Sequence, residues 1–350
     1  MEAFIKGISV ISPPVAAENN NLQALQPGFG YLKCVEPQYR EFIDPMASRR
    51  MSRIVKMGVY CARKCIKETG IDMPDGIIAG TGLGCLEDTG KFLDSIYAND
   101  EKLLNPTPFI QSTHNTIAGA IALAIKCHGY NATYTQRAFS FENALSDAML
   151  QLAENPSMNI LTGGFDEVTE TSFELTSRLG LWKNHPVDIH RLYEYNTRGS
   201  IAGEGVVFMM LGGKQDITGA VCIKSLSYVF DQGSDINGTV LDMLNQKGID
   251  LGKTDLVMLG YNGDSRSDHY YHQLVKGALK HKAVTAYKHL CGEYDTSTSF
   301  ALWLAWHILK NGMPVLPAFT EEKLPQEIRS VLIYNQIRGK YHSVYYLQKC

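Results

Sequence analysis

The sequence predicts an α/β fold made of two similar halves. Runs rich in β-branched residues, which are typical of strands, alternate with helical patterns along the chain. The order of strands and helices begins again after Asp231, and 350 residues are enough for two such halves. The halves should meet near residues 212–218. We therefore predict a first half at residues 1–214 and a second half at residues 215–350.

The first half opens with a predicted strand at residues 3–11. A helix should follow at residues 45–68, because apolar side chains such as Ile54 and Met57 recur at helical spacing opposite a basic face. A strand then leads into a glycine-rich turn at residues 80–84. The other strands of this half are predicted at residues 132–135, 159–162 and 206–211.

The second half repeats this plan without any low-complexity tract. Its predicted elements are a strand at residues 217–230, a helix at 240–246, strands at 256–260 and 283–286, a helix at 296–309, and closing strands at 330–334 and 343–347.

Composition excludes several classes of protein. The formal net charge of -3 argues against a nucleic-acid binder, which would carry a basic excess. The apolar runs at residues 118–125 and 300–306 are far shorter than the roughly 20 residues of a membrane helix, and the first residues lack the pattern of a signal peptide. Eight cysteines without a CxxC pair fit a reduced, cytoplasmic protein. We expect no membrane span, metal or cofactor.

The most informative segment runs from Gly129 to Gly164. It predicts a strand, a tight turn, a helix and a second strand that ends in a glycine pair. Ala138 stands in the turn, within Thr-Gln-Arg-Ala-Phe-Ser. The segment resembles, without a gap, the nucleophile elbow of the β-ketoacyl-[acyl-carrier-protein] synthase family. Ala138 falls at the position of that family's catalytic cysteine.

Further segments at residues 50–70, 80–84, 108–119 and 198–205 are similar to landmarks of the same family, in the same order. The last of them, Arg-Gly-Ser-Ile-Ala-Gly-Glu-Gly, looks like the turn that closes the family's N-terminal half. The resemblance implies the thiolase fold: two βαβαβαββ halves stacked as α-β-α-β-α layers.

The resemblance also exposes losses in the second half. Active relatives use two histidines that hydrogen-bond the thioester oxygen and assist decarboxylation of the donor. Asn262 stands in the place of the first, and Glu293, five residues after Lys288, stands in the place of the second. The glycine-rich loop that completes the oxyanion hole reads Asn-Gln-Ile-Arg-Gly-Lys-Tyr-His at residues 335–342 and keeps one glycine, Gly339.

These substitutions remove the chemistry of condensation. The methyl group of Ala138 cannot hold an acyl chain as a transferable ester. The carboxylate of Glu293 would be an acceptor of the wrong charge for a developing enolate. The resemblance therefore implies a catalytically silent subunit, similar to a chain-length factor, in fatty acid or polyketide biosynthesis.

An alternative is a divergent acyltransferase of the same family that uses another nucleophile, Ser140 or Cys291. Ser140 lies two residues beyond Ala138 at the start of a helix, where serine more often acts as an N-cap. Cys291 lies close to Glu293 in sequence, although a buried, inert thiol is the ordinary role of such a residue. A third possibility is a homodimeric protein that binds acyl ligands without reacting.

Arg137, next to Ala138, gives a specific hypothesis. A buried cation requires an anion. We predict that Arg137 pairs with Glu293 across the former active site and that Asn262 adds hydrogen bonds.

The resemblance also implies partners. Dimers of the family pair the strand before the elbow, here the strand from Asn131 to Thr135, so the partner is either an active ketosynthase or a second copy, with acyl carrier protein delivering the chains. The tunnel for the acyl chain would involve Phe109, Thr113, His114, Asn115, Phe139 and Gly339. The phrases Gln-Ser-Thr-His-Asn-Thr and Phe-Ser-Phe-Glu resemble proteins of aryl polyene or flexirubin-type pathways.

Overall fold

The structure is a computed structural model that describes residues 2–13, 30–215, 219–231, 235–312 and 316–350. The N-terminal half contributes strands β1 (Ala3–Ile11), β2 (Gly76–Gly80), β3 (Tyr130–Tyr134), β4 (Asn159–Asp166) and β5 (Gly205–Gly212). Its helices are α1 (Pro45–Ser48), α2 (Arg53–Thr69), α3 (Leu86–Ala98), α4 (Pro106–Ser112), α5 (Thr116–Ile125), α6 (Ser140–Glu154) and α7 (Glu170–Arg178). Short 3-10 helices are η1 (Tyr39–Glu41), η2 (Arg137–Phe139) and η3 (Ile189–Glu194).

The C-terminal half follows the same plan with fewer helices. Its strands are β6 (Val221–Phe230), β7 (Leu256–Leu259), β8 (Val284–Ala286), β9 (Ser330–Ile337) and β10 (Tyr341–Lys349). Its helices are α8 (Ile236–Gln246), η4 (Leu251–Lys253), α9 (Asp268–Lys276), α10 (Lys288–Cys291) and α11 (Ser297–Asn311).

The ten described strands form one sheet in the order β3-β2-β4-β5-β1-β6-β10-β9-β7-β8. Counted within each half, the strand order from the outer edge inward is third, second, fourth, fifth, first in both cases. β1 and β6 join the halves by a short antiparallel pairing from Ala3 opposite Ile223 to Ile5 opposite Val221. The repeated order confirms the prediction of two similar halves. The boundary between residues 214 and 215 falls between β5 and β6 and stays a prediction.

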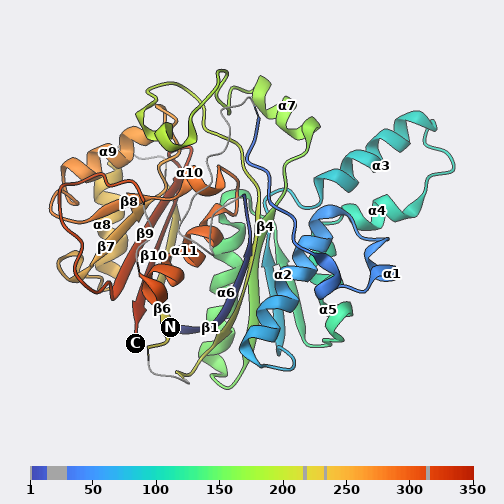
Figure 1. Cartoon of the computed structure of the whole chain (residues 1–350), viewed down its shortest axis with the longest axis horizontal. Helices are drawn as coiled ribbons and strands as arrows, with labels where there is room; N and C mark the ends of the chain where they lie inside the picture. The colour runs from blue at the N-terminus through green and yellow to red at the C-terminus, as the bar shows by residue number, and fades with distance from the viewer. Residues whose placement is uncertain (1, 14–29, 216–218, 232–234, 313–315) are drawn as a thin grey trace.

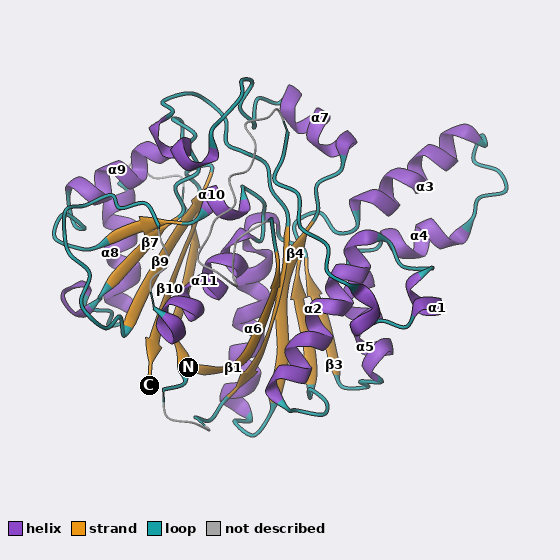
Figure 2. Cartoon of the chain, viewed as in Figure 1, coloured by secondary structure: helices purple, strands orange, loops and turns teal. Residues whose placement is uncertain are grey.

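Helices cover the sheet in layers (Figures 1 and 2). α6 and α11 lie between the halves, and their apolar side chains share one core with strands from both of them. α2 and α5 pack on the outer face of the N-terminal strands, around Ile54, Ile117 and Phe208. α8 and α9 cover the outer face of the C-terminal strands. This arrangement agrees with the layered α/β fold expected from the sequence.

Most predicted strands and helices are present, with some shifted ends. The strand at residues 3–11 is confirmed in full, and β3 begins and ends one to two residues earlier than predicted. The single helix predicted at residues 45–68 is wrong. Asp44 caps α1 by accepting hydrogen bonds from the backbone N–H groups of Met46 and Ala47, and a turn separates α1 from α2. The predicted start of β6 at residue 217 lies outside the described residues.

Two features of the fold matter for function. α3 and α4 form a hairpin that projects from the N-terminal half (Figure 1), held by contact of the Phe92 and Phe109 rings. β3 stands at one end of the sheet, so no described strand of this chain pairs with its outer edge. In the part of the chain that the structure describes, no helix is both long and apolar enough to cross a membrane.

Candidate functional site

The turn that carries Ala138 keeps the geometry of a strand-turn-helix elbow. β3 ends at Tyr134, η2 spans Arg137–Phe139, and α6 begins at Ser140. Arg137 has a φ of 53°, a left-handed conformation that non-glycine residues rarely adopt. A Cβ on Gly80 at the end of β2 would lie 2.4 Å from the carbonyl oxygen of Ser140, so only glycine allows this close approach. The scaffold of the elbow is intact, while Ala138 places a buried methyl group at its centre.

Ser140 is not the helix N-cap that the sequence predicted. Its backbone is already helical, with φ of -60° and ψ of -46°, and Phe139 occupies the cap position. The Ser140 side chain is fully buried, and its Oγ has no hydrogen-bond partner among the described residues. An N-cap needs a non-helical backbone so that its side chain can reach the next turn. No base therefore contacts the hydroxyl that the acyltransferase alternative requires.

Cys291 lies at the end of α10 and is fully buried. Burial raises the pKa of its thiol well above the ordinary value, and the opposite effect of Lys288 is smaller. Its Sγ lies 3.3 Å from the carbonyl oxygen of Gly292. A thiol is a nucleophile only as the thiolate, so this environment fits an inert residue.

Asn262 and Glu293, the residues predicted to stand in place of the two histidines, belong to one polar network. Nζ of Lys288 donates to both carboxylate oxygens of Glu293, at 2.8 and 2.7 Å. Nδ2 of Asn262 donates to Oε2 of Glu293 at 2.7 Å. The Lys288 side chain is fully buried, and that of Glu293 is 13% exposed. The predicted contact of Asn262 with Glu293 is present, and Lys288 supplies the cation.

The predicted pairing of Arg137 with Glu293 is wrong. Nη1 of Arg137 lies 3.5 Å from Oδ2 of Asp295, and the Arg137 side chain is 55% exposed. An exposed guanidinium needs no buried counter-ion, and the buried Lys288 already holds Glu293. Burial and the nearby Asp166 raise the pKa of Asp295 to about 7, against the smaller opposite effect of Arg137.

Asp166 ties three loops together at the end of β4. Its Oδ1 accepts from Oγ1 of Thr81 at 3.0 Å and from the N–H of Gly82 at 2.9 Å. Its Oδ2 accepts from the N–H and Oγ1 of Thr296, at 3.0 and 2.8 Å. Because Thr81 follows β2 and Thr296 precedes α11, this one carboxylate fixes the two halves against each other at the site.

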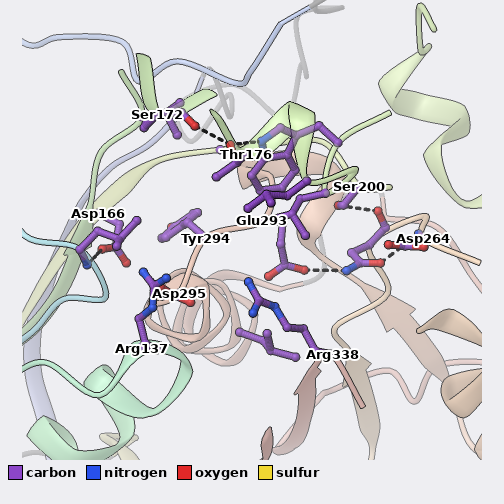
Figure 3. Close-up of a pocket in the computed structure, with 18 of the residues that line it drawn as sticks. Arg137, Asp166, Ser172, Thr176, Ser200, Asp264, Glu293, Tyr294, Asp295 and Arg338 are labelled. Carbon is purple, nitrogen blue, oxygen red and sulfur yellow. Dashed lines mark hydrogen bonds and ion pairs between the residues drawn. The ribbon is translucent and has the colours of Figure 1, made fainter. Parts of the chain in front are cut away.

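A pocket of about 550 Å³ opens in front of this network, between the two halves (Figure 3). Both halves contribute charged and polar side chains, while the apolar part of the lining comes from the N-terminal half and from Ile337. The lining residues are Leu83, Leu86, Arg137, Asp166, Glu167, Val168, Ser172, Thr176, Leu179, Leu181, Trp182, Ser200, Gly203, Asn262, Asp264, Arg266, Ser267, Glu293, Tyr294, Asp295, Ile337 and Arg338.

The pocket collects some of the predicted site residues and leaves others out. Arg137, Asn262 and Glu293 line it. Ala138, Ser140 and Lys288 are buried outside the lining. The six predicted tunnel residues also lie outside it. Phe109, Thr113, His114 and Asn115 are exposed around α4, Phe139 packs against Tyr228 and Tyr341, and Gly339 lies in the turn between β9 and β10. Their role in a tunnel remains a prediction.

Several residues of the site were not singled out from the sequence. Asp166 carried a usable signal, since it is a carboxylate at the end of the strand that follows the elbow helix. Asp295 lies two residues after Glu293, and Arg338 lies inside the altered loop. Trp182 had no signal, because it reaches the pocket from an irregular segment after α7. Among the described residues, no group of histidine, cysteine and carboxylate side chains is arranged to hold a metal ion.

Comparison with protein families supports the resemblance seen in the sequence. Residues 30–179 match the family model described as the N-terminal domain of β-ketoacyl synthases. The matched range includes the elbow, α3, α4 and β4. No curated protein sequence matches the chain. The expected resemblance to β-ketoacyl synthases is confirmed by this domain.

Solved structures share the whole fold at low sequence identity. The ishigamide ketosynthase/chain length factor superposes with a TM-score of 0.76 and 15% identity, covering 100% of this chain and 99% of the other. A β-ketoacyl synthase from Burkholderia phymatum gives a TM-score of 0.78 with 13% identity over 100% and 99%. The ketosynthase ApeO in complex with its chain length factor ApeC, from Xenorhabdus doucetiae, gives 0.75 with 14% identity over 99% and 98%. These likenesses establish the fold.

Proposed function

We propose that this chain, whose residues 30–179 form a β-ketoacyl synthase N-terminal domain, is a non-catalytic subunit that resembles a chain-length factor. It would pair with an active ketosynthase that condenses chains bound to acyl carrier protein. The observation that carries the proposal is an intact elbow with Ala138 at its centre, combined with Glu293 held by Lys288. The scaffold is kept, and the groups needed for acyl transfer are replaced.

The structural neighbours support a paired subunit. Two of them are described as a ketosynthase together with a chain length factor, from the ishigamide system and from Xenorhabdus doucetiae. A third is a type II polyketide ketosynthase in complex with its acyl carrier protein. We infer the same kind of partners for this chain, in a pathway of the aryl polyene or flexirubin type.

The edge strand β3 supports the pairing. The backbone N–H of Thr81 donates to the carbonyl oxygen of Tyr134, so Tyr134 faces β2. Because neighbouring residues of a strand point their backbone groups to opposite sides, Asn131 and Thr133 direct theirs to the unpaired edge. Unpaired edges are usually covered or blocked in stable proteins. A partner strand would complete this one.

Apolar side chains continue the proposed interface beyond the strand. Leu123 of α5, Phe109 and Ile110 of α4, and Tyr97 of α3 are all more than half exposed. α4 contacts α5, and α5 packs on β3. Contiguous exposed apolar surface usually marks an interaction site. Phe109, one of the predicted tunnel residues, lies on this surface, where a partner would contact it.

Co-expression with a ketosynthase from the same host, one that has the cysteine and both histidines, tests the proposal. We expect the two chains to co-purify in equal amounts. The pair should condense an acyl group with a malonyl group, each bound as a thioester to acyl carrier protein. Replacing the partner's cysteine with alanine should abolish condensation. Replacing both Ser140 and Cys291 of this chain with alanine should leave the rate unchanged.

Two results would contradict the proposal. One is covalent labelling of the isolated chain by a chloroacyl or cerulenin-type probe, which would support the acyltransferase alternative. The other is a stable homodimer of this chain that does not exchange with the ketosynthase, which would support the acyl-binding alternative.

A further inference from the structure

Most charges in the pocket are already paired. Nη2 of Arg266 lies 2.6 Å from Oδ2 of Asp264. Lys288 holds Glu293, and Asp295 lies beside Arg137. Asp166 is saturated by backbone and hydroxyl donors. Each of these groups therefore already has a partner within the protein.

Arg338 is different. It lines the pocket, and Figure 3 shows its side chain pointing in from below Glu293. In the described part of the chain, its guanidinium has no hydrogen bond and no ion pair within 4.0 Å. A weaker electrostatic interaction reaches Asp295. A guanidinium has five donors in a planar fork that suits a carboxylate, so this residue presents an unused anion-binding group.

The backbone that carries Arg338 is firmly placed. Arg338 and Gly339 both have positive φ, 57° and 62°, in the tight turn between β9 and β10. The N–H of Gly339 donates to Oε1 of Gln336 at 2.7 Å, and Gln336 is fully buried. A Cβ at Gly339 would lie 2.6 Å from the Tyr270 ring. The turn therefore holds the base of the Arg338 side chain at the pocket, although its tip is exposed.

Apolar side chains form another part of the pocket wall. Val168, Leu179, Leu181 and Trp182 belong to it. The indole Nε1 of Trp182 donates to Oγ1 of Thr176 at 2.6 Å, so the ring presents no unpaired donor. A volume of about 550 Å³ lies within the usual range of small-molecule sites, roughly 300–1,000 Å³.

We propose that this pocket binds an amphipathic monocarboxylate, with its carboxylate on Arg338 and its apolar chain against Leu179, Leu181 and Trp182. A single negative charge is favoured because Glu293, Asp295 and Asp264 surround the site and would repel a dianion. The inference concerns this chain alone and does not depend on the pairing proposed above.

Calorimetric titration of the purified full-length chain with octanoate tests the inference. We expect saturable binding with one site per chain. Octanamide, which has the same length but no charge, and octyl phosphate, which is largely dianionic, should each bind at least about tenfold more weakly, as expected from the loss of one charge-assisted bond or from repulsion. The same titration on a co-purified complex would show whether pairing leaves the pocket open.

Two variants make the test specific. Arg338→Gln should weaken octanoate binding about tenfold or more while leaving the thermal midpoint nearly unchanged, because its guanidinium makes no hydrogen bond or close ion pair with the described residues. Lys340→Gln, in the same turn but outside the pocket lining, is the matched control and should bind as the parent does. Equal binding of octanoate and octanamide, unchanged binding by Arg338→Gln, or no binding at all would overturn the inference. Failure to bind would leave co-purification with the ketosynthase unaffected, so the two proposals fail separately.

Discussion

Lys288 and Glu293 form an ion pair where active relatives are expected to keep a lysine and a histidine. A fully buried ammonium is unfavourable unless it is paired and hydrogen-bonded. Glu293 provides the pairing with both of its oxygens, and Asn262 completes it. Glu293, Lys288 and Asn262 thus stabilise one another inside the protein.

We predict that Glu293→Gln lowers the free energy of unfolding by about 3–5 kcal/mol, because it leaves Lys288 buried without a counter-ion. The double variant Lys288→Met with Glu293→Gln should recover much of that loss, since it removes both charges. Urea denaturation of the parent, the single variant and the double variant measures the difference. A double variant no more stable than Glu293→Gln would show that the ion pair itself is not the source of the effect.

Glu142 is a second buried residue whose replacement should change the stability of the protein. It is fully buried on α6, and its Oε1 accepts from the hydroxyls of Tyr345 at 2.7 Å and Thr298 at 3.1 Å. Its Oε2 has no partner among the described residues. Burial raises its pKa to about 7, against the smaller opposite effect of these hydrogen bonds. The folded protein therefore favours the protonated acid.

Because its folded pKa is raised, Glu142 contributes stability that is complete below about pH 4.5 and is lost as the pH rises through about 7. We predict that Glu142→Gln, a neutral isostere, is more stable than the parent at pH 8 by on the order of 2–3 kcal/mol. The advantage should shrink at pH 5. Thermal unfolding at the two pH values checks this, and an equal change at both would contradict it.

Among the elements, β3 is the strand through which we propose that the chain pairs. β2 pairs with one edge of β3, and none of the strands that the structure describes pairs with the other edge. Ala132 and Thr133 of this strand are partly buried, and the backbone groups of Thr133 face the unpaired edge. The hairpin of α3 and α4 extends the same region with exposed apolar side chains.

We predict that Thr133→Pro prevents co-purification with the ketosynthase, because proline removes the N–H that a partner strand needs. Thr133→Val is the matched control. It keeps the N–H and removes a hydroxyl that has no hydrogen-bond partner among the described residues, so pairing should persist. Light scattering of the purified mixtures measures the outcome, and circular dichroism checks that both variants fold. Pairing by the proline variant would place the interface elsewhere.

Across the whole molecule, buried titratable groups should shape the pH dependence of stability. Burial raises the pKa values of Glu142, Glu167, Asp268 and Asp295 to about 7. Burial also lowers the pKa of His289 to about 3 and those of His272, His307 and His342 by smaller amounts. The acids stabilise the protein at low pH, and the histidines stabilise it above about pH 6.5.

The two sets oppose each other between about pH 4.5 and 6.5. Just above that window the contribution of the acids still changes, so their stabilisation is lost as the pH rises through about 7. We predict that the melting temperature is nearly constant between about pH 5 and 6 and falls between about pH 6 and 8. Differential scanning calorimetry over this range tests it. A melting temperature that rises from pH 6 to pH 8 would show that these carboxyl groups are ionised in the folded protein.

The sequence alone predicted the order of the strands along the chain and the elbow segment that carries Ala138. Both are local properties. Strand and helix patterns repeat within short windows, and the elbow is contiguous from Gly129 to Gly164. The break between α1 and α2 was missed because a helical pattern of apolar residues says little about where a capped turn interrupts it.

Tertiary structure decided which charges meet. Arg137 and Glu293 are separated by 155 residues in the sequence, and their alignment positions alone suggested a contact. The packing of the two halves instead brings Asp295 to Arg137 and leaves Glu293 to the nearby Lys288. The pocket, with Arg338 and Trp182 in its lining, exists only where these halves meet. Such contacts depend on side-chain geometry across the interface between the halves, and no local pattern in the sequence encodes it.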